Sequence, residues 1–337
     1  MPTRFQRFGN DLYTGARSVD FIGQRKIWYT ITILAIIASV VIPIVRGGFN
    51  FGIDFVGGSQ FSISDVTTTD QSLAEDAVAS VAPDAQVSVT SVNDNAVRVQ
   101  TDQLTDQQSL AVVKALAKAY DVNVKEVAST YIGPSWGADV SKKAIQGLVV
   151  FLLLAFIAMG LYFRTWKMSA AAILSLLHDM VVTAGVYALV GFEITPATMI
   201  GFLTILAYSL YDTVVVFDKI KENTSEDADK TRRTFSESVN LAVNQTLVRS
   251  INTGVIAVLP VAAILFIGAL VFGADTLKDI SLALFIGILL GTYSTIFIAS
   301  PLYSHFREGE PKIRKHDRKV LATRPKAREA AAAALAE

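Results

Sequence analysis

The chain has 337 residues, no cysteine, and thirty basic against thirty acidic residues. Hydrophobic residues make up 52% of it, more than an ordinary soluble domain carries. The lack of cysteine excludes disulfide scaffolds and thiol chemistry.

Six runs of about 20 mostly uncharged residues are each near the length that a helix needs to cross a bilayer. They predict membrane helices over residues 27–45, 144–163, 169–190, 196–217, 251–271 and 280–302. The first run is too long for a signal-peptide core, so we expect a retained anchor. The runs show no period-two alternation, which disfavours a membrane β-barrel.

Basic residues gather in segments 1–26, 164–168, 218–250 and 303–337. Six spans place all four segments on one side, which the positive-inside rule makes the cytoplasm. Segment 46–143 is then external, and between residues 47 and 141 it holds twelve acidic against four basic residues. We predict a multi-pass protein of the cell (inner) membrane with both termini cytoplasmic, and a frayed tail over the alanine-rich residues 327–337.

The external segment alternates short strands and helices. The pattern predicts strands at 59–64, 85–91, 96–100 and 122–132, helices at 70–81 and 105–120, and a hairpin turn at Asn93-Asp94-Asn95. The order βαββαβ predicts a small ferredoxin-like α+β domain between the first two membrane helices. The domain has no His, no Cys and no phosphate-binding loop, which favours docking over catalysis.

One carboxylate, Asp212, lies inside the fourth span. An Asp at the centre of a membrane helix costs about 2.5–3.5 kcal/mol on insertion scales, so it needs a reason to be there. Helical spacing places Tyr208 and Ser209 near it as hydrogen-bonding groups. Burial disfavours the charged form and raises the pKa of a carboxyl group, which would let Asp212 take up and release protons. The alternative is a structural Asp paired with a neighbouring helix.

Two further polar groups lie in or beside the spans. Ser175, His178 and Asp179 share one face of the third span, where interhelix bonding and participation in a relay are equal alternatives. Arg249 precedes the fifth apolar run, after an amphipathic stretch that predicts an earlier helix start. It either snorkels to the cytoplasmic interface or pairs with Asp212.

Two small-residue patterns predict close backbone contacts. In the segment that enters the external domain, Gly52, Gly57 and Gly58 permit tight turns, and Asp54 is placed to cap them. In the sixth span, small residues recur every four positions and form a face for tight helix packing; they are Ala283, Gly287 and Gly291.

These motifs resemble the SecF family, the smaller half of the SecDF accessory component of the bacterial Sec translocon, within the resistance-nodulation-division superfamily. The matching segments run in the family's order and are 19–26, 51–58, 175–179, 208–223 and 244–249. The chain departs from the usual pattern at Ala207 and Tyr211, and in the run 253–256.

The resemblance implies a proton-driven translocation subunit, not an enzyme, and the chain contains no Walker A sequence. Its six helices would pair with six of SecD beside SecYEG, and proton flow would help pull unfolded preproteins outward after the ATP-driven step. By motif, Asp212 and Arg249 are the relay residues, with His178 and Asp179 beside them. The resemblance implies no cofactor and no metal, with protons as the coupling ion.

The expected partners are SecD, SecYEG, SecA indirectly, the preprotein and membrane lipid, with no nucleic acid. Two alternative functions remain. One is a subunit of a proton-coupled small-molecule exporter of the same superfamily, and the other is a non-titrating structural scaffold of the translocon.

Overall fold

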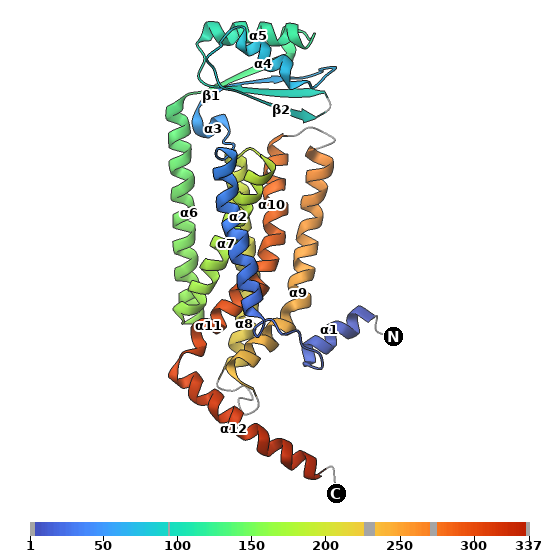
Figure 1. Ribbon diagram of the computed structural model, residues 1–337, viewed down its shortest axis with the longest axis vertical. Helices are drawn as coiled ribbons and strands as arrows, with labels where there is room; N and C mark the ends of the chain where they lie inside the picture. The colour runs from blue at the N-terminus through green and yellow to red at the C-terminus, as the bar shows by residue number, and fades with distance from the viewer. Residues whose placement is uncertain (1–3, 94, 226–232, 270–274, 335–337) are drawn as a thin grey trace.

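The computed structural model describes residues 4–93, 95–225, 233–269 and 275–334. The described chain forms an elongated bundle of helices with a small α/β domain at one end and helix α12 at the other (Figure 1). Asp94 of the predicted hairpin, residues 226–232 of a predicted loop, and residues 270–274, which cover the end of the predicted fifth span and the start of the loop after it, lie outside the described residues.

The helices of the bundle and of the two chain ends are α1 (Arg4–Thr14), α2 (Arg25–Arg46), α6 (Pro134–Phe163), α7 (Trp166–Val190), α8 (Pro196–Thr224), α9 (Phe235–Ala263), α10 (Asp275–Ser294), α11 (Ser300–Glu308) and α12 (Pro311–Ala334). Two π-helical segments, η2 (Ile264–Ala269) and η3 (Thr295–Ala299), continue α9 and α10. Six helical stretches of the described chain are long and apolar enough to span a membrane, as predicted.

Three of these spans form the centre of the bundle. In the spans built on α7, α8 and α10, half of the 18-residue apolar stretch is buried inside the described structure. In the spans built on α2, α6 and α9 the buried share is 11–17%. The central helices pack on one another, and α9 packs on α8 and α10. A polar group carried by the central helices is therefore shielded from lipid.

Several helices extend beyond their apolar runs. Helix α9 begins at Phe235, well before the run that starts at 251, as the amphipathic stretch predicts. Its start is fixed by a capping box in which the Thr234 and Glu237 side chains each bond the other residue's backbone N–H. The predicted frayed tail is wrong as far as Ala334, because alanine-rich sequence favours helix and α12 continues through it.

The α/β domain has the predicted βαββαβ order, with β1 (Gly58–Ile63), α4 (Gln71–Ala79), β2 (Val87–Asn93), β3 (Ala96–Thr101), α5 (Asp106–Ala119) and β4 (Val127–Ile132). The sheet is antiparallel in the order β2-β3-β1-β4, the ferredoxin-like arrangement. The last strand is shorter than predicted, since a 3₁₀ turn, η1 (Val124–Glu126), precedes it. An Asn123 cap on this turn takes the backbone out of the strand.

The two faces of the sheet differ in polarity. One face buries Phe61, Val97 and Val99 in a core with residues of α4 and α5. The opposite face carries Gln60 and Gln100, which are paired across β1 and β3. Figure 1 shows α4 and α5 on the side of the sheet away from the bundle, so the polar face is turned toward the membrane helices.

Candidate functional site

The carboxylate of Asp212 on α8 is buried between helices. The residue is 3% exposed, and its Oδ1 atom accepts a hydrogen bond of 3.0 Å from Ser250 Oγ on α9. Its Oδ2 atom is also buried and has no hydrogen-bond partner among the described residues. One oxygen of this carboxylate is therefore open to a proton or a water molecule.

The carboxylate of Asp179 on α7 is fully buried, and both of its oxygens have partners. Its Oδ1 atom lies 3.1 Å from His178 Nδ1. Its Oδ2 atom accepts hydrogen bonds of 2.7 Å from Ser209 Oγ on α8 and 2.8 Å from Ser294 Oγ on α10. Four helices, α7 to α10, thus bring two carboxylates and three serines into one buried polar layer.

None of the three predicted supporting residues bonds Asp212 in the described structure. Ser209, predicted beside Asp212, bonds Asp179 instead, because its hydroxyl faces α7. The Tyr208 and Ser175 hydroxyls are buried and unpartnered among the described residues. The donor that Asp212 does have, Ser250, is one that the sequence interpretation missed. Its only signal in the sequence is its place directly after Arg249.

Arg249 makes no ion pair with Asp212 in the described structure, and its side chain is exposed on α9. Neighbouring residues of a helix point about 100° apart, so when Ser250 faces Asp212 its neighbour faces the bundle surface. A charged side chain on the outside of a membrane helix is unfavourable in lipid, which indicates contact with water or a partner.

Small residues make the close approach of these helices possible. A Cβ atom at Gly287 on α10 would lie 2.2 Å from Ile205 on α8, and one at Gly291 would lie 3.0 Å from Ser209. On α8, a Cβ atom at Gly201 would lie 2.7 Å from the Ala283 Cβ atom. The predicted small-residue face of the sixth span is confirmed as the contact with α8.

A π-helical segment follows the polar layer on the sixth span. η3 begins at Thr295, directly after Ser294, and ends two residues before Pro301. Thr295 Oγ1 lies 3.0 Å from Thr213 Oγ1 on α8, and Ser300 Oγ donates to the Thr295 carbonyl oxygen at 3.1 Å. Pro301 has no backbone N–H to donate to the preceding turn, so regular α-helical bonding is interrupted at this point.

The glycine-rich segment 51–58 forms the junction between the bundle and the α/β domain. It contains the short helix α3 (Ile53–Val56), and Gly57 and Gly58 have φ of +79° and +137°, which favour glycine. Burial raises the pKa of the Asp54 carboxyl above its ordinary range, and the negative charge of Glu193 raises it further. The two glycines therefore allow the tight turn that the sequence predicts at this junction.

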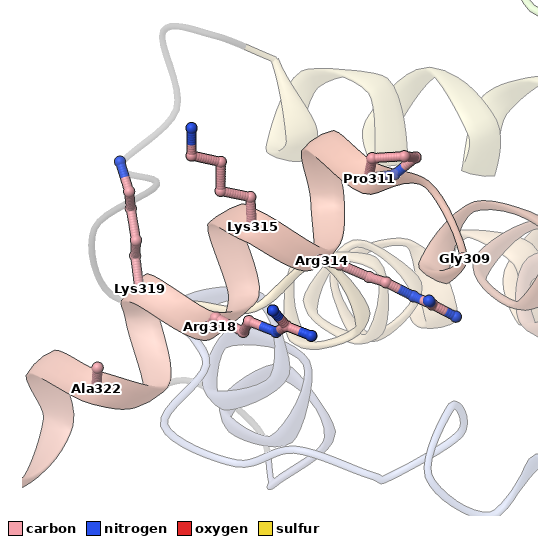
Figure 2. A pocket seen from close by; sticks show the side chains of 7 residues that line it. All are labelled: Gly309, Pro311, Arg314, Lys315, Arg318, Lys319 and Ala322. Atoms are coloured by element: carbon pink, nitrogen blue, oxygen red, sulfur yellow. The ribbon is translucent and has the colours of Figure 1, made fainter.

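A basic face lies at the opposite end of the molecule, on α12. A groove there is lined by Arg314, Lys315, Arg318 and Lys319, all on one side of the helix (Figure 2). The other side of α12 is fixed to the bundle, since Ile313 is buried in its core. The basic face therefore points away from the bundle, as a solvated helix face does. Within the described residues, no group of three His, Cys, Asp or Glu residues is placed to hold a metal ion.

The fold and the site define a multi-pass helical membrane protein with a lipid-shielded layer of carboxylates. The comparisons with known proteins agree. The family model "Protein export membrane protein SecD/SecF, C-terminal" matches residues 112–309, and "SecD/SecF GG Motif" matches residues 44–64. The chain belongs to the SecD/SecF family of protein-export membrane proteins, and its similarity is to the SecF side of that family.

The relatives show how far the similarity extends. "Protein translocase subunit SecF" of Streptomyces coelicolor is 45% identical over 316 residues, which cover 94% of this chain and 84% of that protein. The subunit of the same name from Mycobacterium tuberculosis (strain CDC 1551 / Oshkosh) is 42% identical, covering 94% of this chain and 73% of that protein.

A solved structure supports the fold. The crystal structure of SecDF, a translocon-associated membrane protein from Thermus thermophilus, matches with a TM-score of 0.73 and 28% identity, covering 87% of this chain. The match spans 39% of that longer chain. Comparison thus makes this chain a counterpart of one part of a SecDF protein.

Proposed function

We propose that this chain works with SecD to use the proton-motive force in protein export, after the ATP-driven step of translocation. The observation that supports this most is the half-satisfied carboxylate of Asp212. A buried carboxylate with one open oxygen is suited to take up and release a proton, whereas the fully bonded Asp179 is suited to hold the helices in register.

The exposed side of α9 supports a membrane partner at this site. Arg249 is exposed there together with Val255, Ile256 and Leu259, whose side chains are 54–69% exposed in the single chain. We propose that SecD covers this side and supplies the environment of Arg249. The longer SecDF chain, in which the match covers 39% of the residues, supports such a pairing.

The charge distribution supports a cytoplasmic location for the α12 end and an external location for the α/β domain. Basic residues of α12 lie at the end of the bundle opposite the sheet (Figure 1). We further propose that the complex acts beside SecYEG, with SecA engaged indirectly and the preprotein as cargo. Protons are the coupling ion.

The test is secretion of a Sec substrate into membrane vesicles, with and without a proton gradient. In Asp212→Asn the side chain keeps its shape and cannot titrate, so we expect the gradient-dependent part of secretion to be lost and the ATP-dependent part to remain. Ser175→Ala, which removes a buried hydroxyl that no described group bonds, is the matched control. Full gradient-dependent stimulation in Asp212→Asn would leave the chain as a structural scaffold.

A further inference from the structure

The loop between α7 and α8, residues 191–195, is hydrogen-bonded to the polar face of the sheet. Glu193 accepts a hydrogen bond of 3.2 Å from Arg98 Nη1 and one of 2.6 Å from Gln100 Nε2, both on β3. The side chains of Arg98 and Glu193 are only 14% and 15% exposed. The contact is therefore a sheltered, charge-assisted pair, stronger than a surface ion pair.

The backbone of the domain junction runs against the same loop. Gly52 N donates to the Ile194 carbonyl oxygen at 2.9 Å, and Ile194 N donates to the Asn50 carbonyl oxygen at 2.8 Å. A Cβ atom at Gly52 would lie 2.6 Å from Glu193 Oε1. Gly52 is therefore the residue that lets the Glu193 side chain pass to the sheet.

The loop is also tied to the helices that carry the polar layer. It joins α7, which carries Asp179, to α8, which carries Asp212. Thr195 Oγ1 in the loop donates to Asp279 Oδ2 on α10 at 2.8 Å, and the Tyr187 hydroxyl of α7 donates to the Asp279 carbonyl oxygen at 3.2 Å. Three helices of the polar layer thus converge at the point where Glu193 holds the sheet.

We propose that Glu193 is a positioning residue that couples movement of the carboxylate-bearing helices to the α/β domain. The coupling rests on the proposed proton-driven function, whereas the contact of Glu193 with the sheet does not. Asp179 lies eleven residues before the end of α7, about 16 Å along the helix axis. A rigid helix transmits a shift over that length, and the loop passes it to Arg98 and Gln100.

Two different changes disturb this contact. Glu193→Gln removes the charge and keeps the shape. Gly52→Ala keeps the charge and forces the Glu193 side chain aside. Gly147→Ala on α6, where an added Cβ atom meets nothing within 4 Å, is the matched glycine control, and the pair Glu193→Arg with Arg98→Glu restores the opposite charges.

The structural measurement uses the full chain with SecD in proteoliposomes. Because the chain has no cysteine, spin labels on Lys114→Cys in α5 and Leu189→Cys in α7 report the distance between the domain and the bundle. We expect Glu193→Gln and Gly52→Ala each to shift the ratio of docked to undocked domain about tenfold toward undocked, the scale of one charged hydrogen bond. The charge-swapped pair should restore the docked distance.

The functional measurement is gradient-dependent secretion in the vesicle assay. We expect both variants to reduce it while ATP-dependent secretion remains. If both variants keep the wild-type distance between the spin labels, Glu193 does not hold the domain on the bundle. If the distance increases but gradient-dependent secretion stays at the wild-type level, Glu193 does not couple the helices to the domain. If Asp212→Asn abolishes the stimulation while Glu193→Gln and Gly52→Ala do not, the proposed function stands and Glu193 has no part in it. If Asp212→Asn has no effect, the proposed function fails and the coupling fails with it.

Discussion

Asp179 and Asp212 lie in the same buried layer, and their carboxylates differ in how many donors surround them. Asp179 is bonded by His178 and by serines of two other helices, whereas Asp212 has Ser250 on one oxygen only. A fully bonded buried carboxylate is expensive to disturb, and a half-bonded one is free to exchange a proton. On this difference rests the proposal that Asp179 has a structural part and Asp212 a titrating one.

The donors of Asp179 make a direct prediction. Ser209→Ala and Ser294→Ala should each lower the free energy of unfolding by about 1–3 kcal/mol, because each removes a donor from a buried carboxylate oxygen. Both serines bond the same oxygen, so the double variant should not show the sum of the single effects. The measurement is a double-mutant cycle on the solubilised protein. Ser175→Ala, which removes a buried hydroxyl without a partner among the described residues, is the control and should cause no loss of stability. Additive losses would contradict the shared contact.

The raised pKa of Asp54 gives a pH-dependent prediction. Because burial and Glu193 raise this pKa in the folded state, the folded protein binds the proton more tightly, and the ionised group destabilises it at neutral pH. Asp54→Asn should raise the melting temperature at pH 7. The gain in the free energy of unfolding should be less than about 1 kcal/mol, because the group is partly exposed. The gain should shrink as the pH falls toward about 3.9, the ordinary Asp value. Asp76→Asn, an exposed acid on α4, should show no such gain.

At the scale of elements, the close contact of α8 and α10 decides which side chains meet. Gly287 and Gly291 let α10 approach until Ser294 reaches across to Asp179 on α7. In lipid, helices associate through packing and hydrogen bonds rather than through burial of apolar surface from water. The small-residue face is therefore part of what builds the polar layer.

Gly287→Ala tests this contact. The added methyl group would meet Ile205 at 2.2 Å, so we expect a loss of about 1–3 kcal/mol of stability from overpacking. Adding Ile205→Ala should restore part of the loss by making room. Gly147→Ala, in open space on α6, should be neutral or slightly stabilising. Equal stability of Gly287→Ala and Gly147→Ala, measured by thermal unfolding, would refute the close contact.

At the scale of the whole molecule, the two ends of the bundle differ in chemistry. One end carries the α/β domain, whose polar face is held by Glu193, and the other carries the basic α12 (Figure 1). A positively charged end is retained in the cytoplasm during insertion. This asymmetry supports the proposed orientation of the chain in the membrane.

Single cysteines in the otherwise cysteine-free chain test that direction. Lys114→Cys on α5 should react with a membrane-impermeant thiol reagent added to intact spheroplasts. Lys315→Cys on α12 should react only after the membrane is opened. Both lysines are exposed, so access to the reagent depends on the side of the membrane and not on burial. Reversed labelling would invert the proposed topology.

Six spans, the βαββαβ domain between the first two, the small-residue face of the sixth span and the unusual place of Asp212 could all be predicted from the sequence. These follow from local periodicity and from the cost of a charge in lipid, which the chain order alone carries. Three pairings became visible only in the folded chain: Ser209 bonds Asp179, Ser250 bonds Asp212, and Glu193 bonds Arg98 of the sheet. Those pairings join residues 30 to 95 positions apart, and which pairs meet depends on the rotation and approach of whole helices.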